Sequence, residues 1–316
     1  MSSLPAFKKH IWDTQINVRD FVFTNLSPYD GAADFLVGPT ERTKKLWAEC
    51  AQLLAQERKN GGVLEIDTKT IPTITSHAPG YIDKELETIV GFQTDKPLKR
   101  AIKPFGGWRV VKQACEENGA QLDQSVIEIC SKYRKTHNDG VFDAYTSNMR
   151  KLRKTGLITG LPDNYARGRI IGDYRRLALY GTDALIAAKE ADKKALDGAM
   201  TNEVIQLREE ISEQIKALTM SAEMAASYGF DVTKPATTAQ EAIQWTYFAY
   251  LAAIKEQDGA AMSLGNVSSF FDVYIERDLQ AGVLTEEQAQ ELVDHFVMKL
   301  RLVRHLRMDE YNQLFS

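Results

Sequence analysis

The sequence predicts a helix-rich fold of the α/β class, with few and short strands in this chain. Apolar residues recur at steps of three and four along several stretches of the 316 residues, which places them on one face of an α-helix. The alternation of apolar and polar residues that marks a half-buried strand occurs only in short runs. A hydrophobic fraction of 44% and a charged fraction of 26% are typical of a globular protein with an apolar core.

The first amphipathic helix is expected around residues 46–54. Its apolar stripe consists of Leu46, Trp47, Cys50, Leu53 and Leu54. Because Cys50 belongs to that stripe, we expect it to pack as a small hydrophobe rather than to act as a catalytic thiol. Residues 60–85 contain two prolines and a glycine pair and are predicted to be extended chain and turns. Residues 103–108 and 135–146 are predicted loops.

Residues 201–228 are predicted to form a long amphipathic helix. Their apolar stripe comprises Val204, Leu207, Ile211, Ile215 and Leu218. Thr238 and Glu241 then have the spacing of a capping box, in which each side chain bonds the other's backbone N–H at a helix start. The helix that follows is nearly all apolar over residues 242–254, and a helix that is apolar all round is expected to be buried.

A last amphipathic helix is predicted to follow a second capping box formed by Thr285 and Gln288. Apolar residues at helical spacing continue from Ala289 to Val303. His295 and His305 are expected on the polar face of this helix.

The composition indicates which binding partners and which cellular compartment to expect. The net charge of −4 gives no reason to expect a nucleic acid or an anionic membrane surface as partner. The three cysteines are far apart and form no C-x-x-C pair and no metal-binding spacing with the five histidines, so no metal site and a reducing, cytoplasmic location are expected. No apolar run reaches the roughly 20 residues of a membrane span.

The stretch LPDNYARGRIIGDYRRLALYG, residues 161–181, concentrates four arginines: Arg167, Arg169, Arg175 and Arg176. One interpretation is a surface helix with scattered arginines, in which Arg169 could pair with Asp173. The other is that the glycines on either side of Arg169 allow close backbone approach, so that its guanidinium grips a carboxylate inside a pocket. The sequence alone leaves both open.

A run of small residues follows the buried helix, at Gly259, Ala260, Ala261, Ser263 and Gly265. Small side chains leave room for a substrate beside the backbone, but close packing of two elements explains the same run. His77 and His137 fall in predicted loops, where solvation or a local hydrogen bond is the simpler expectation. The sequence contains no H-E-x-x-H, G-x-S-x-G, P-loop or G-x-G-x-x-G motif.

Longer phrases of the chain resemble the pyruvate formate-lyase family of glycyl radical enzymes, the formate C-acetyltransferases. The phrases run in family order over nearly the whole chain: VRDF (18–21), SPYDG (27–31), TITSHAPGYIDKELE (73–87), PLKRAIKPFGG (97–107), YRKTHNDGVFDAYT (133–146), TGLPDNYARGRIIGDYRRLALYG (159–181), AQEAIQWTYFAYLAAI (239–254) and GAAMSLG (259–265). The resemblance implies the N-terminal part of that family's ten-stranded α/β barrel, and we expect residues 1–316 to form a single segment of it.

The resemblance also implies a reaction, in which pyruvate and CoA give acetyl-CoA and formate by radical cleavage of a C–C bond. It assigns Arg169 to the pyruvate carboxylate and Ala260 and Ala261 to the lining of the pyruvate pocket. It assigns Phe142, Arg153 and Lys154 to CoA, with an aromatic face for adenine and cations for phosphate. CoA is a co-substrate here, and no cofactor is expected to be bound by this chain.

The chain departs from the family pattern in the groups that carry the radical. It has no adjacent Cys-Cys pair, no radical-glycine segment and no second carboxylate arginine, so we expect no catalytic residue in this chain and no activity of the chain alone. The expected partners are a C-terminal pyruvate formate-lyase fragment with the cysteines and the radical glycine, a radical-SAM activating enzyme, and a second copy of the chain in a homodimer. The alternative is a non-catalytic interaction module that binds such an enzyme or its partners.

Overall fold

A computed structural model describes residues 4–29, 31–104, 107–134, 143, 145–157, 172–256 and 263–316. Helices dominate these ranges, as the sequence predicts. In chain order the elements are η1 (Ile11–Asp13), α1 (Val18–Asn25), α2 (Glu41–Lys59), β1 (Glu65–Asp67), β2 (Lys99–Ala101), α3 (Trp108–Glu117), α4 (Gln124–Tyr133), α6 (Ser147–Lys154), α8 (Arg175–Ala195), α9 (Asn202–Ser227), α10 (Ala239–Glu256), α11 (Ser268–Gln280), α12 (Glu286–Leu302) and α13 (Asp309–Phe315).

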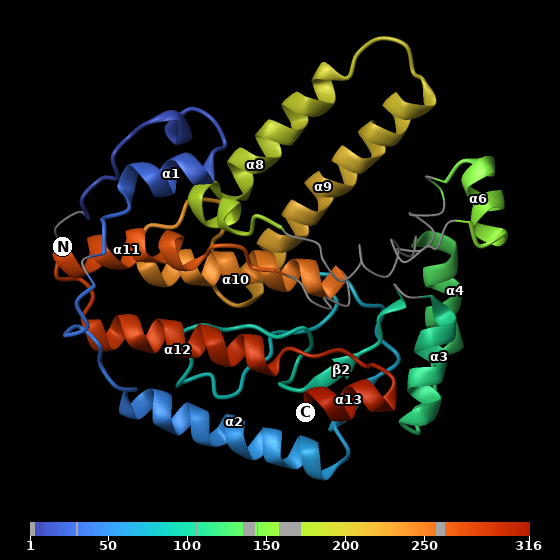
Figure 1. The fold of residues 1–316 in the computed structure, drawn as a ribbon, viewed down its shortest axis with the longest axis horizontal. Helices are drawn as coiled ribbons and strands as arrows, with labels where there is room; N and C mark the ends of the chain where they lie inside the picture. The colour runs from blue at the N-terminus through green and yellow to red at the C-terminus, as the bar shows by residue number, and fades with distance from the viewer. Residues whose placement is uncertain are drawn as a thin grey trace.

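Helix α10 crosses the middle of the molecule and packs against α8, α9, α11 and α12 (Figure 1). Helix α2 packs on the far side of α12, and α8 and α9 form a hairpin that projects from the rest (Figure 1). Helices α3, α4 and α6 lie together at one end of the molecule (Figure 1). None of the described helices combines the length and the apolar character needed to cross a bilayer.

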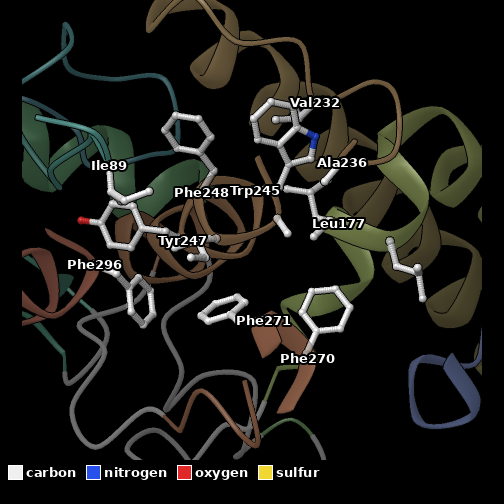
Figure 2. Packing of buried hydrophobic residues seen from close by; sticks show 14 of the residues in the cluster. Ile89, Leu177, Val232, Ala236, Trp245, Tyr247, Phe248, Phe270, Phe271 and Phe296 are labelled. Carbon is white, nitrogen blue, oxygen red and sulfur yellow. The ribbon is translucent and has the colours of Figure 1, made fainter. Parts of the chain in front are cut away.

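The central position of α10 follows from its sequence. Trp245, Tyr247 and Phe248 are buried on different sides of this helix, among the aromatic and aliphatic residues of its neighbours (Figure 2). Their polar atoms are satisfied: the Tyr247 hydroxyl donates to the Gly91 carbonyl over 2.8 Å, and Trp245 Nε1 donates to the Lys234 carbonyl over 3.1 Å. The prediction of a buried helix here is confirmed.

The described residues contain one small sheet. Strands β1 and β2 pair in parallel with Ile66 opposite Arg100, and Ala101 forms a further parallel bridge with His305. Each strand has three residues, which agrees with the expectation that the chain supplies few and short strands.

The helix starts follow the predicted capping pattern in most respects. The Thr285–Gln288 capping box at the start of α12 is complete. At α10 the Thr238 hydroxyl accepts from the Glu241 N–H over 3.2 Å, but the Glu241 carboxylate reaches one residue further back and accepts from the Thr237 N–H over 2.6 Å. The predicted box at Thr238 is therefore half formed, with Thr237 completing it.

Gly181 explains why the arginine-rich stretch ends on Tyr-Gly. Its φ of +72° interrupts α8, and a Cβ at this position would lie 2.4 Å from the Thr233 carbonyl oxygen. The N–H of Thr182 donates to the Val232 carbonyl over 2.9 Å. Glycine therefore allows α8 to bend where the chain before α10 crosses it.

The prediction that His295 and His305 lie on a polar face is wrong. Helix α12 ends at Leu302, so His305 lies beyond it, and both imidazoles are buried. His295 Nδ1 accepts from the Thr88 N–H over 3.1 Å. Burial lowers the pKa of His295 to about 4. The expectation for Cys50 is confirmed: it is fully buried, and burial raises the pKa of its thiol to about 11.

Candidate functional site

Four of the six residues assigned to substrates lie outside the described residues: Phe142, Arg169, Ala260 and Ala261. They belong to residues 135–142, 158–171 and 257–262. The structure does describe what lies on either side of these segments. Most of these flanking residues meet around the C-terminal end of α10.

The last turn of α10 is held by a lysine from a distant part of the chain. The ammonium of Lys103 donates to the Lys255 carbonyl, one of the terminal helix carbonyls that have no partner within the helix. Lys255 itself is 2% exposed, and burial lowers the pKa of its ammonium to about 8. Lys255 stands two residues before residues 257–262, so Lys103 helps to fix the point where that segment leaves the helix.

Glu256, the last residue of α10, connects two loops. Its Oε1 accepts from the Thr73 hydroxyl and from the Ile74 N–H, the latter over 3.3 Å. Its Oε2 accepts from the guanidinium of Arg134, which directly follows α4. Arg134 precedes residues 135–142 and Glu256 precedes residues 257–262. The ion pair therefore brings together the N-terminal flanks of the segments that carry Phe142 and Ala260.

The end of the Arg169 segment is packed against α10 by two tyrosines. The rings of Tyr174 and Tyr250 meet edge to face with their centroids 5.7 Å apart. Burial, with the neighbouring Tyr250, raises the pKa of the Tyr174 hydroxyl to about 12. A Cβ on Gly172 would lie 2.7 Å from Tyr174 Cε1, so any side chain at this position would force the Tyr174 ring to shift. One of the two glycines beside Arg169 is thus required by packing within the chain.

Two further arginines of the stretch, Arg175 and Arg176, have separate roles, while Arg167 lies outside the described residues. Arg175 donates through Nε to Asp173 over 2.7 Å and through Nη1 to the Asn266 carbonyl over 2.9 Å. Arg176 is more exposed and lies 3.9 Å from Asp173. Asp173, considered above as a partner of Arg169, is thus bound by Arg175. The Asn266 contact joins the C-terminal flanks of residues 158–171 and 257–262.

The two remaining predicted residues lie on α6. Arg153 and Lys154 occupy its last turn together with Lys151, where positive charge is favourable at a helix C-terminus. The Arg153 guanidinium lies 6.0 Å from the centre of the Tyr145 ring. Lys154 is exposed. The helix thus presents cations to solvent at the end of the molecule where α4 ends.

His77 has the local role that its loop position predicts. Its Nε2 lies 3.0 Å from Asp67 Oδ2 and its Nδ1 lies 3.0 Å from the Ser76 hydroxyl. The hydrogen bond from His77 holds the pKa of the Asp67 carboxyl well below its usual range. Within the described ranges no group of three or more histidine, cysteine or acidic residues could hold a metal ion.

Sequence reasoning missed Glu256, Arg134 and Lys103. Arg134 and Glu256 are 122 positions apart, and no periodicity or motif spacing connects residues at that separation. Both stand at the edge of segments that the sequence singles out, which is the only signal that could have drawn attention to them.

Comparison with known proteins identifies a matching family and a relative of the chain. The family described as "Pyruvate formate lyase-like" matches residues 11–316. The formate acetyltransferase of Haemophilus influenzae is 58% identical over 310 residues, which cover 96% of this chain and 40% of that enzyme. The chain therefore spans about two fifths of the length of this relative.

Solved structures agree on the fold. The glycerol-bound B12-independent glycerol dehydratase from Clostridium butyricum superposes with a TM-score of 0.59 at 15% identity, over 90% of this chain and 42% of that one. A glycyl radical enzyme from Archaeoglobus fulgidus superposes with a TM-score of 0.52 at 16% identity, over 83% and 40%. These likenesses confirm the predicted fold class, an N-terminal portion of the glycyl radical enzyme fold. The chain belongs to the pyruvate formate-lyase-like family.

Proposed function

We propose that this chain supplies the N-terminal portion of a pyruvate formate-lyase that converts pyruvate and CoA into formate and acetyl-CoA. The observation that carries the proposal is the 58% identity to a formate acetyltransferase over 96% of the chain. The convergence of the flanks of residues 135–142, 158–171 and 257–262 supports it, because these segments contain the residues assigned to both substrates. In this proposal residues 1–316 act as a single unit.

In the proposed reaction Arg169 binds the pyruvate carboxylate through two parallel hydrogen bonds and so fixes the ketone for attack. Ala260 and Ala261 leave the space that pyruvate occupies. A cysteine thiyl radical adds to the ketone carbon, and the C1–C2 bond breaks homolytically. The acetyl group stays on sulfur as a thioester, and the carboxyl fragment takes a hydrogen atom from the thiol of the adjacent cysteine to become formate, which leaves the radical on that second sulfur. The CoA thiol then accepts the acetyl group and the cysteine thiol is restored.

CoA in this proposal binds at the end of the molecule formed by α4 and α6. Arg153 and Lys154 face its phosphates and Phe142 its adenine ring. The adjacent cysteines, the radical glycine and the second carboxylate arginine are not among these 316 residues. In the assembled enzyme they come from a further polypeptide segment, and a radical-SAM enzyme generates the glycyl radical.

The proposal is tested by anaerobic reconstitution. The 316-residue chain is mixed with a polypeptide that supplies the rest of a family member and with the activating enzyme, and formate is measured together with the glycyl EPR signal. The proposal predicts a glycyl radical and pyruvate-dependent formate only when both polypeptides are present. Formation of the radical without formate would contradict it. Binding of this chain to an already complete enzyme, with no gain in formate, would favour the non-catalytic interaction module instead.

A further inference from the structure

The carboxylate of Glu256 joins the flanks of two proposed substrate segments, because Glu256 precedes residues 257–262 and binds Arg134, which precedes residues 135–142. We propose that Glu256 is a positioning residue that couples the CoA site to the pyruvate pocket, so that a change at this carboxylate disturbs the binding of both substrates. The identity of the two substrates rests on the proposed function. The contacts of Glu256 are observed in the structure and do not depend on it.

Both oxygens of the carboxylate are used. Oε1 accepts from the Thr73 hydroxyl and the Ile74 N–H, while Oε2 accepts from the Arg134 guanidinium. Each partner is a donor, so the site requires two acceptor oxygens. The arrangement joins the loop at residues 73–74, the end of α4 and the end of α10 in one place.

Both members of the ion pair lie close in sequence to residues assigned to the substrates. Glu256 stands four residues before Ala260, and Arg134 stands eight residues before Phe142. With side chains that are 34% and 30% exposed, Arg134 and Glu256 form an ion pair that adds little to overall stability. Its contribution lies in geometry, because it joins the end of α4 to the end of α10, from which residues 135–142 and 257–262 continue.

Glu256→Gln tests the carboxylate with almost no change in shape. Glutamine has one acceptor oxygen and one NH₂ donor. If its oxygen faces Thr73 and Ile74, the NH₂ meets the Arg134 guanidinium, donor against donor; if it is turned round, the NH₂ meets the Ile74 N–H. Either orientation breaks one side of the contact.

Arg134→Met removes only the link to residues 135–142 and leaves Glu256 bound to Thr73 and Ile74. Arg134→Lys keeps the charge and is expected to restore part of the function. Glu213→Gln on α9 is the matched control, because Glu213 is 75% exposed and lies 3.9 Å from Lys216.

The first measurement is amide hydrogen exchange of the 316-residue chain, which needs no activity. Glu256→Gln is expected to speed exchange in peptides that cover residues 72–76 and the last turn of α4, and Glu213→Gln is expected to change neither. Unchanged exchange in Glu256→Gln would overturn the proposal, whatever the enzyme does.

The second measurement is steady-state kinetics of the reconstituted enzyme. Glu256→Gln is expected to raise the KM for CoA and the KM for pyruvate together, each by about threefold to tenfold, with a smaller change in kcat. Arg134→Met is expected to raise mainly the KM for CoA, and Arg134→Lys to reverse part of that rise. A rise in only one KM with Glu256→Gln would overturn the coupling. Absence of formate with the unaltered chain would contradict the proposed function, and the exchange experiment would still decide whether Glu256 holds the segments together.

Discussion

The guanidinium of Arg175 donates a hydrogen bond to the main-chain carbonyl of Asn266 across 2.9 Å. Arg175 follows residues 158–171, and Asn266 follows residues 257–262. The contact therefore fixes the C-terminal flank of the segment that carries Arg169 relative to that of the segment that carries Ala260 and Ala261. If these residues share a pyruvate pocket, the shape of the pocket depends on this hydrogen bond.

We predict that Arg175→Met raises the KM for pyruvate in the reconstituted enzyme by about tenfold, because hydrogen bonds of charged groups contribute about 1.5–3 kcal/mol. The KM for CoA is expected to stay within about twofold, since among the described residues no contact of Arg175 leads to α4 or α6. Arg176→Met is the control, because Arg176 is 54% exposed and only approaches Asp173 at 3.9 Å. Equal effects of the two substitutions on the KM for pyruvate would contradict the role given to Arg175.

Gly172→Ala is expected to destabilise the chain. The added Cβ would lie 2.7 Å from the Tyr174 ring, which is buried against Tyr250. Forcing a methyl group into packed surroundings costs about 1–3 kcal/mol. Denaturant unfolding should show this loss for Gly172→Ala and almost none for Gly38→Ala, whose Cβ meets nothing within 4 Å. Equal stability of the two variants would show that the ring of Tyr174 is not held against Gly172.

We predict that the folded chain loses stability in mild acid because two of its histidines are buried. Burial lowers the pKa of His295 to about 4, and burial among cations such as Lys103 lowers that of His305 well below its ordinary value. In the unfolded chain an imidazole titrates near about 6.5. Below that pH the unfolded state binds protons that the folded state does not, so the free energy of unfolding falls as the pH drops from about 6.5 toward about 4, by up to about 1.4 kcal/mol per pH unit for each histidine.

Equilibrium unfolding between pH 7.5 and 4.5 checks this prediction. His305→Leu should flatten the decline, because both ring nitrogens of His305 are buried and have no hydrogen-bond partner in the structure described here. His77→Gln is not a suitable control, because the His77 ring bonds Asp67. His10→Gln is not suitable either, because the His10 ring bonds Asp20, so the comparison is made with the unaltered chain. The histidine account fails if the acid decline of His305→Leu matches that of the unaltered chain.

The ion pair between Lys299 and Glu87 is fully buried, and its loss should be severe. Glu87 Oε1 also accepts from the Ile82 and Asp83 N–H groups, and the Lys299 ammonium lies 4.0 Å from the centre of the Phe92 ring. Lys299→Met leaves a buried carboxylate without its counter-charge and is expected to cost about 3–5 kcal/mol.

A double-mutant cycle separates this cost from the loss of packing. Lys299→Met combined with Glu87→Gln removes the isolated charge, so the double variant should be more stable than Lys299→Met alone. Purely additive losses would show that the two groups do not interact.

The sequence predicted the helices more reliably than the environment of their polar faces. Helix α10 could be recognised because every side of it is apolar. On α12 the polar residues Glu291, His295 and Lys299 follow helical spacing, which favours a solvent-facing stripe, yet all three are buried. Each has a polar partner from another part of the chain: Thr40 for Glu291, Thr88 for His295 and Glu87 for Lys299. Hydrophobic periodicity does not show which distant residue will pair with a polar side chain.

The candidate site shows the same limit. The resemblance could assign Arg169, Ala260 and Ala261, because these residues belong to long matching phrases. The described residues that flank these segments, Glu256 and Arg175, bind partners 122 and 91 positions away. Three-dimensional contact determines these pairings, and a single sequence does not reveal it.

The central claim is that Arg169 binds the carboxylate of pyruvate, and the most direct test is the dependence of formate production on pyruvate concentration for Arg169→Met in the reconstituted enzyme. Arg167→Met, two residues away, is the matched control. We predict that Arg169→Met lowers kcat/KM for pyruvate by about thirtyfold or more while the glycyl EPR signal persists, because the substrate's carboxylate then enters the pocket without this partner. A kcat/KM for Arg169→Met equal to that of the Arg167→Met control would contradict the claim.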